Sequence, residues 1–161
     1  MNVYSMKAGH HIVASTVFSG SLYLIYPSLE IAAASFVAGV LIDVDHCIDY
    51  VIEFGIRSKW SNFFRSFEEG QYTRIYIVFH GWEWIPVLGA MSWLTEYNPW
   101  VVGILLGAAQ HLILDQLTNS TACLGYSLIW RWTKKFEPNQ AFPYRKKPFH
   151  GPGQNSTNLS Q

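Results

Sequence analysis

The chain has 161 residues, of which half are hydrophobic, 16% are aromatic and 14% are charged, and its formal net charge is zero. Soluble domains carry about 25% charged residues, so this composition is unusually apolar. The lack of a basic excess argues against nucleic acid as a partner. The length suits one helical, membrane-associated domain, which we expect over residues 1–148, followed by a disordered polar tail over residues 149–161.

Four long apolar segments follow one another along the chain and predict helices. They span residues 12–26, 31–42, 75–94 and 100–117, and Pro27 ends the first of them. The very short turns YPSLE and TEYNP join the first segment to the second and the third to the fourth. We therefore expect an all-α fold, a helical bundle of about four apolar, transmembrane helices arranged as two hairpins.

Lysine and arginine are confined to one side of this predicted topology. If both short turns face one side of a membrane, the N-terminus, the polar segment 49–74 and the C-terminal region share the other side, and every Lys and Arg falls there. This distribution predicts a protein of the inner, cytoplasmic membrane with both termini in the cytoplasm. The alternative is a soluble, buried four-helix bundle, which the modest mean hydropathy favours.

Histidine and carboxylate side chains interrupt each apolar segment near its predicted cytoplasmic end. His111 and Asp115 are spaced i, i+4, and Asp43 and His46 are spaced i, i+3, so each pair shares a helix face. His10 and His11 compete for one role on the first helix. The candidate metal ligands are His10, His11, Asp43, Asp45, His46, His80, His111 and Asp115.

These side chains together predict a metal site. Burying histidines and acids with no basic residue beside them calls for a compensating cation. Mixed imidazole and carboxylate ligands suit Zn²⁺, with Mn or Fe as alternatives, and the number of candidates suits two or more ions. Taken singly, each histidine has a simpler interpretation as a satisfied core residue, and Asp43 or Asp45 as a helix cap. We expect Asp49 and Glu53, just beyond this cluster, to be solvated.

Four motifs carry a family resemblance. They are HHIVAS, LIDVDH, FHGWEW and QHLILDQLTN, in this order along residues 8–130. At these residues the chain resembles the YdjM-like family of membrane-bound metal-dependent hydrolases, once described as LexA-regulated. Its members typically carry a His on the first apolar helix, a Leu-Pro-Asp-x-Asp element, a His-Arg-Gly-x-x-His-like element and a His-x-x-x-Asp element.

The resemblance implies a phosphoester hydrolase. The family is distantly similar to zinc-dependent phospholipase C and P1 nuclease, all-helical enzymes in which His and Asp hold a zinc cluster. This chain departs from the family pattern at two places. Ile42 replaces the usual Pro, and FHGWEW lacks the Arg and the second His while offering Glu83 instead.

A membrane-bound metal-dependent hydrolase is therefore the leading hypothesis. Water activated by the metal would attack phosphorus or a carbonyl carbon, with Glu83 and Asp43 as candidate catalytic groups for proton transfer. Membrane lipids and an amphiphilic or phosphoester small molecule are the expected partners. An anionic head group would meet the basic residues Arg74, Arg131, Lys134 and Lys135.

Two other functions compete with this hypothesis. A protein that binds or transports metal without catalysis would carry ligands along a path through the bilayer, and the outer halves of the helices carry almost none. A structural bundle stapled by its metal would show a closed site with four ligands, whereas catalysis needs an open position. The basic stretch RWTKKF also has a simpler interpretation as a juxtamembrane anchor.

Overall fold

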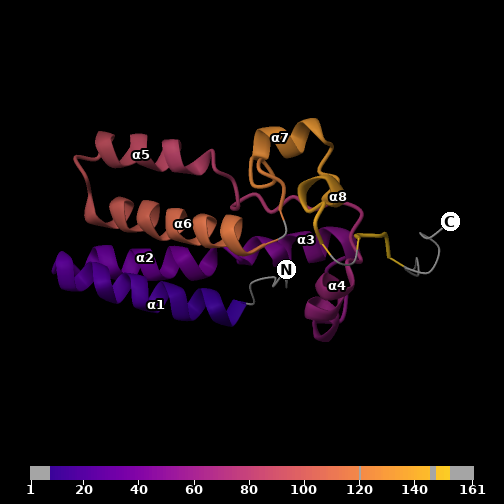
Figure 1. Cartoon of the computed structure of the whole chain (residues 1–161). Helices are drawn as coiled ribbons and strands as arrows, with labels where there is room; N and C mark the ends of the chain where they lie inside the picture. The colour runs from indigo at the N-terminus through magenta and orange to yellow at the C-terminus, as the bar shows by residue number, and fades with distance from the viewer. Residues whose placement is uncertain (1–7, 120, 146–147, 153–161) are drawn as a thin grey trace.

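The computed structural model describes residues 8–119, 121–145 and 148–152, and all regular elements in these ranges are helical (Figure 1). The prediction of an all-α fold is therefore confirmed. In chain order the helices are α1 (Ala8–Ile25), α2 (Leu29–Leu41), α3 (Val44–Phe54), η1 (Trp60–Asn62), α4 (Phe63–Glu69), α5 (Trp84–Leu94), α6 (Pro99–Thr118), α7 (Leu128–Thr133) and α8 (Pro138–Ala141).

Both predicted hairpins occur, and capping residues begin their second helices. The Ser28 hydroxyl accepts a hydrogen bond from the Ile31 amide at the start of α2, and the Asn98 side chain accepts one from the Trp100 amide at the start of α6. Proline at the first position of α6 fixes a helical φ where no amide donor is needed. The two hairpins meet where α2 packs against α6, which is the most extensive contact between helices.

The third predicted helix is wrong over its first half. Residues 75–83 form no regular helix, and α5 begins only at Trp84. The amides of Tyr76 and Ile77 donate to the Asp49 carboxylate on α3, and Ile77 has a φ of 32°, which a right-handed helix does not allow. This backbone is therefore bonded to another part of the molecule, and α5 keeps only 11 residues.

Two helical stretches of the described chain are long and apolar enough to cross a membrane. They are Leu29–Phe54, which contains α2, the turn at residues 42–43 and α3, and Pro99–Thr118, which is α6. A membrane span takes about 20 residues, so α5 is too short. The prediction of about four transmembrane helices is therefore not confirmed.

The long helices bury mainly small and polar side chains and expose most of their large apolar ones, although Leu112 on α6 is fully buried. On α1 the buried stripe is His11, Ser15 and Ser19, whereas Val13 and Val17 are exposed. The contact of α2 with α6 is likewise built from small residues, which are Ala34, Ser35, Gly39, Gly103, Gly107 and Ala108. A soluble bundle buries its apolar stripe instead, so this packing is typical of helices that face lipid.

Gly107 sets the closest approach of α6 to α2. A Cβ atom added there would lie 2.2 Å from the Ser35 carbonyl oxygen, a backbone atom that has no rotamer to escape into. We expect Gly107→Ala to lower the free energy of unfolding by about 1–3 kcal/mol. Gly89→Ala on α5 is the matched control, because a Cβ there meets nothing within 4 Å. Thermal unfolding in detergent checks this, and equal stabilities of the two variants would contradict it.

Helices α3, α4, α7 and α8 and the loop before α5 form a cap at one end of the bundle (Figure 1). An aromatic core holds the cap together, and it comprises Tyr50, Tyr72, Ile75, Ile77, Tyr126 and Phe149. Phe149 is buried and its amide donates to the side chain of Asn139, so the packed region extends past the boundary at residue 148 that the sequence predicted. The rest of the predicted tail, from residue 153, lies outside the described residues.

Candidate metal centre

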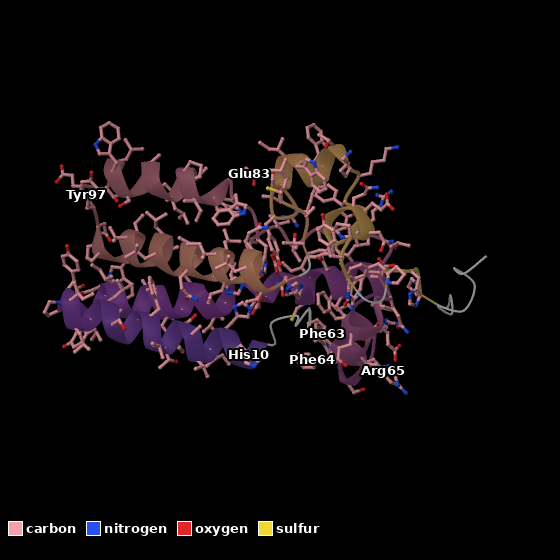
Figure 2. All side chains as sticks on the ribbon, in the orientation of Figure 1. His10, Phe63, Phe64, Arg65, Glu83 and Tyr97 are labelled. Atoms are coloured by element: carbon pink, nitrogen blue, oxygen red, sulfur yellow. The ribbon has the colours of Figure 1, made fainter. Side chains whose placement is uncertain are left out.

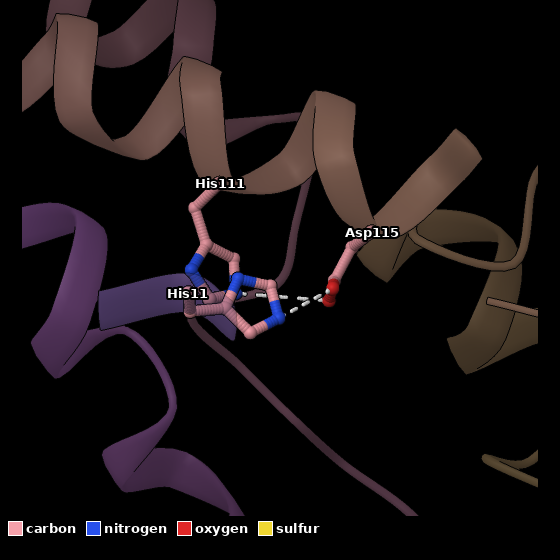
Figure 3. Close-up of side chains that lie close together, drawn as sticks. All are labelled: His11, His111 and Asp115. Atoms are coloured by element: carbon pink, nitrogen blue, oxygen red, sulfur yellow. Dashed lines mark ion pairs between the residues drawn. The ribbon is translucent and has the colours of Figure 1, made fainter. Parts of the chain in front are cut away.

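The predicted ligands from four separate segments meet where the bundle joins the cap. His11 lies in the first turn of α1, and His111 and Asp115 lie in the last turns of α6 (Figure 3). The break between α2 and α3 supplies Asp43, the first turn of α3 supplies Asp45 and His46, and the loop before α5 supplies His80. The short interhelical turns lie at the opposite end, where Figure 2 labels Tyr97. The up-down topology thus places all these groups at one depth, as the sequence predicted.

Hydrogen bonds orient the two most buried histidines. Nδ1 of His80 lies 3.0 Å from Oδ2 of Asp45, and Nδ1 of His111 lies 2.8 Å from the Gly39 carbonyl oxygen. Both partners are acceptors, so each Nδ1 can donate its proton to them, and each Nε2 is left to hold a proton or a metal ion. A carboxylate or carbonyl behind an imidazole is the usual support of a metal-bound histidine.

Four ligand atoms lie close together around the two inner histidines. Nε2 of His80 lies 3.1 Å from Nε2 of His111, and Oδ1 of Asp43 lies 3.3 and 3.4 Å from these two nitrogens. Oδ2 of Asp115 lies 3.4 and 3.7 Å from the same nitrogens. Tetrahedral bonds of about 2.0–2.1 Å place neighbouring ligand atoms about 3.3–3.4 Å apart, so these separations fit Zn²⁺.

The charge of this group also fits a cation. Two imidazole lone pairs that face each other at 3.1 Å repel unless a proton or a metal lies between them. His80 and His111 are fully buried, and two carboxylates lie within 3.7 Å of them. Buried anions need compensation, and a divalent ion provides it while using all four atoms. The residues present therefore fit a metal ion.

Two further histidines widen the site. Nε2 of His11 lies 3.1 Å from Oδ1 of Asp115, and its ring stacks on His111 with centroids 4.0 Å apart (Figure 3). Nε2 of His46 lies 3.7 Å from Oδ1 of Asp43. Two groups of possible ligands result, each with its atoms within 4.8 Å of one another, and they are His11 with His111 and Asp115, and Asp43 with His46 and His80. His10 is exposed and belongs to neither group.

Glu83, which Figure 2 labels, belongs to neither group of possible ligands. Its carboxylate accepts hydrogen bonds from the Ser127 hydroxyl and from the amides of Leu128 and Ile129, at 2.6, 2.9 and 3.0 Å. Burial alone would raise the pKa of Glu83, but these bonds hold the pKa below its usual range. Glu83 therefore caps α7, and the structure does not bring it to His80 as the predicted helix would have done.

Arg131 is also placed differently from the prediction. Its side chain is buried, and its guanidinium donates to the carbonyl oxygens of Tyr76, Ile77 and His80. Burial lowers the pKa of Arg131 to about 10, so the side chain stays charged at neutral pH. An arginine enclosed in this way holds the His80 loop and is not available to a head group. The other predicted head-group residues, Arg74, Lys134 and Lys135, are exposed.

The expectation that Asp49 is solvated is wrong. Asp49 is buried, and its carboxylate accepts from the amides of Tyr76 and Ile77, while Glu53 accepts from Thr73. Asp49 and Arg131 thus hold the backbone that leads to His80 from two sides. Sequence reasoning also missed Tyr126, whose ring stacks on His80 with centroids 5.9 Å apart. No local pattern marks these roles, because every partner is distant in sequence.

Comparisons of the chain with protein-family models, with curated proteins and with solved structures give no match. The resemblance to the YdjM-like family stays a prediction.

Asp45 is expected to strengthen metal binding by supporting the His80 imidazole. Asp45→Asn removes the charge that supports Nδ1 of His80 and disturbs the bond from the Phe79 amide. We expect metal affinity to fall by roughly 10–100-fold. Competition with a metal-binding dye measures the affinity, and Glu83→Gln is the control because Glu83 lies outside the cluster. Equal affinities of the two variants would contradict the role of Asp45.

Proposed function

We propose that the chain is a membrane-bound, metal-dependent hydrolase that acts on a phosphoester or lipid-like substrate at the cytoplasmic membrane face. The observation that carries the proposal is the convergence of His80, His111, Asp43 and Asp115 in a cluster that stays partly exposed at Asp43 and His46. The large apolar side chains that the long helices expose support membrane association. The confinement of Lys and Arg to one side of the predicted topology supports the orientation of the protein in the membrane. The family resemblance points to the same chemistry.

The ligands differ in their exposure to solvent, and this difference favours catalysis on the side of Asp43 and His46. The side chains of Asp43 and His46 are 23% and 22% exposed, whereas that of Asp115 is 4% exposed and those of the inner histidines are buried. Water and substrate therefore approach past Asp43 and His46. A second ion held beside His11 or His46 would have fewer protein ligands and so could bind water or substrate. Zn²⁺ suits the ligands best, with Mn or Fe as alternatives.

The reaction would be hydrolysis of an ester bond. When bound, a divalent ion supplies Lewis-acid chemistry, which polarises the electrophile and makes water nucleophilic near neutral pH. The water oxygen forms a bond to phosphorus, the bond from phosphorus to the ester oxygen breaks, and a proton passes from water to the leaving oxygen. Asp43 is the candidate to relay that proton, because Glu83 is engaged at α7. Asp45 and the Gly39 carbonyl keep both imidazoles oriented.

A specific observation favours a second candidate function, a structural bundle stapled by metal. Four ligand atoms that are mostly buried resemble a closed structural zinc site. In that case the ion would hold α1, α2 and α6 to the loop before α5. Such a protein would lose stability without metal and would hydrolyse nothing.

An activity assay separates the two functions. Purified protein in detergent is incubated with a chromogenic phosphodiester and with phospholipids, before and after chelation and after return of Zn²⁺. The hydrolase predicts product release that chelation abolishes and metal restores. Loss of stability on chelation with no hydrolysis of any phosphoester or carboxylic ester would favour the structural staple.

A further inference from the structure

An apolar groove runs along the outside of the bundle. It encloses about 480 Å³ between α2, α5 and α6, because α5 packs on α6 and leaves the face of α2 beside it uncovered. Its lining comes from α2 with Val37 and Leu41, from α5 with Trp84 and Leu88, and from α6 with Ile104. Apolar side chains supply the whole lining, so the groove offers an occupant no polar side-chain partner.

One end of this groove adjoins the metal centre. The lining includes Ile42 and Phe79, which are the residues directly before Asp43 and His80. From there the groove extends to Trp100 at the far end of α6. Ala108 marks its course one helical turn before His111, and about 12 Å of α6 separates Ala108 from Trp100. One end of the groove therefore lies at the sequence neighbours of the cluster, and its course along α6 is about two helical turns long.

We propose that this groove binds one acyl chain of a lipid whose polar head lies at the metal centre. This inference rests on the proposed function and names its substrate class, an acyl lipid with an ester or phosphoester beside its head group. Both helical stretches long enough to span a membrane line the groove, so in the proposed membrane placement the medium around it is hydrocarbon. A hydrocarbon chain along α2 and α6 leads from the bilayer to Asp43, the most exposed ligand of the tetrad formed by His80, His111, Asp43 and Asp115.

The lining discriminates against a peptide or a helix from another protein. A peptide in extended form would bring amides and carbonyls that find no polar side chain in the groove, and each unsatisfied group costs free energy. An acyl chain has no such groups. A pocket of about 480 Å³ lies in the size range of small-ligand sites, so one chain suits it better than a whole partner helix.

The test uses two matched variants on one helix. Ile104→Trp fills the groove, whereas Ile113→Trp adds the same bulk at an exposed position of α6 that is not part of the lining. Each protein is purified in detergent and incubated with phosphatidylglycerol carrying a photoactivatable diazirine on one acyl chain. Crosslinked lipid is then quantified by mass spectrometry, and the labelled residues are mapped.

We expect Ile104→Trp to reduce specific crosslinking by roughly tenfold or more, since excluding two or three methylene groups costs that much affinity. Ile113→Trp should crosslink like the wild type, with labels at Val37, Leu41 or Leu88. Equal crosslinking of both variants, or labels spread evenly over exposed apolar residues, would overturn the groove. Metal content and thermal unfolding of the same samples keep the outcomes distinct, because lack of metal in the wild type refutes the hydrolase and not the groove.

Discussion

Replacing His80 with alanine is expected to abolish metal-dependent hydrolysis. His80 joins the tetrad through Nε2 and the Asp45 carboxylate through Nδ1, so its loss removes a ligand and strands a buried acid. Loss of the several kcal/mol of transition-state stabilisation that a catalytic ion supplies corresponds to a fall in kcat/KM of about 10³-fold or more. Hydrolysis of the chromogenic phosphodiester at saturating Zn²⁺ measures the effect.

His10→Ala is the matched control, because His10 lies on α1 and is exposed. We expect it to keep near wild-type activity, whereas His11→Ala should lose metal affinity through Asp115. Added imidazole should restore part of the activity of His80→Ala by occupying the vacated space. A folded His80→Ala variant with wild-type kcat/KM would contradict the assignment of the tetrad.

Arg131→Met is expected to cause the largest loss of stability. The substitution keeps much of the volume but leaves the carbonyls of Tyr76, Ile77 and His80 buried without their donor. Each unsatisfied buried group costs about 1–3 kcal/mol, so we expect a loss of at least about 3 kcal/mol. For a chain of this size that corresponds to a fall in melting temperature of roughly 6–12 °C.

Arg74→Met tests whether loss of a positive charge alone lowers the melting temperature, because Arg74 is an exposed arginine just before the same loop. It should leave the melting temperature within about 2 °C of the wild type, as surface substitutions usually do. Arg131→Lys should recover little, since an ammonium group cannot reproduce the guanidinium fork. A melting temperature of Arg131→Met equal to that of Arg74→Met would contradict the structural role of Arg131.

The helical hairpins and the shared faces of helices could be predicted from periodic and local patterns in the sequence. The contacts made by the loops could not. The apolar runs and the turns at Pro27 and Pro99 were sufficient to predict both hairpins. The i, i+4 spacing of His111 and Asp115 was sufficient to predict their shared helix face. Up-down topology then placed the histidines and acids of separate helices at one depth, which is how distant residues were expected to meet.

The wrong predictions for residues 75–83, Glu83 and Arg131 have one physical cause. Residues 75–83 are apolar enough to be helical, yet their backbone bonds to Asp49 and Arg131, and a partner so distant in sequence leaves no local trace. The same bonds explain why Arg131 is buried and why Glu83 reaches α7 and not His80. Tertiary contacts here override local preference, and the irregular backbone they produce carries a ligand of the metal centre.

Metal content tests the site most directly. Wild-type protein purified in detergent, with metals supplied during purification, is analysed by elemental mass spectrometry beside a variant with both His111→Ala and Asp115→Ala. The cluster predicts about one equivalent of Zn, Mn or Fe per chain in the wild type, or about two if both groups of ligands are filled, and a loss of bound metal in the folded variant. A folded wild type that binds no metal under these conditions would contradict both the metal centre and the hydrolase built on it.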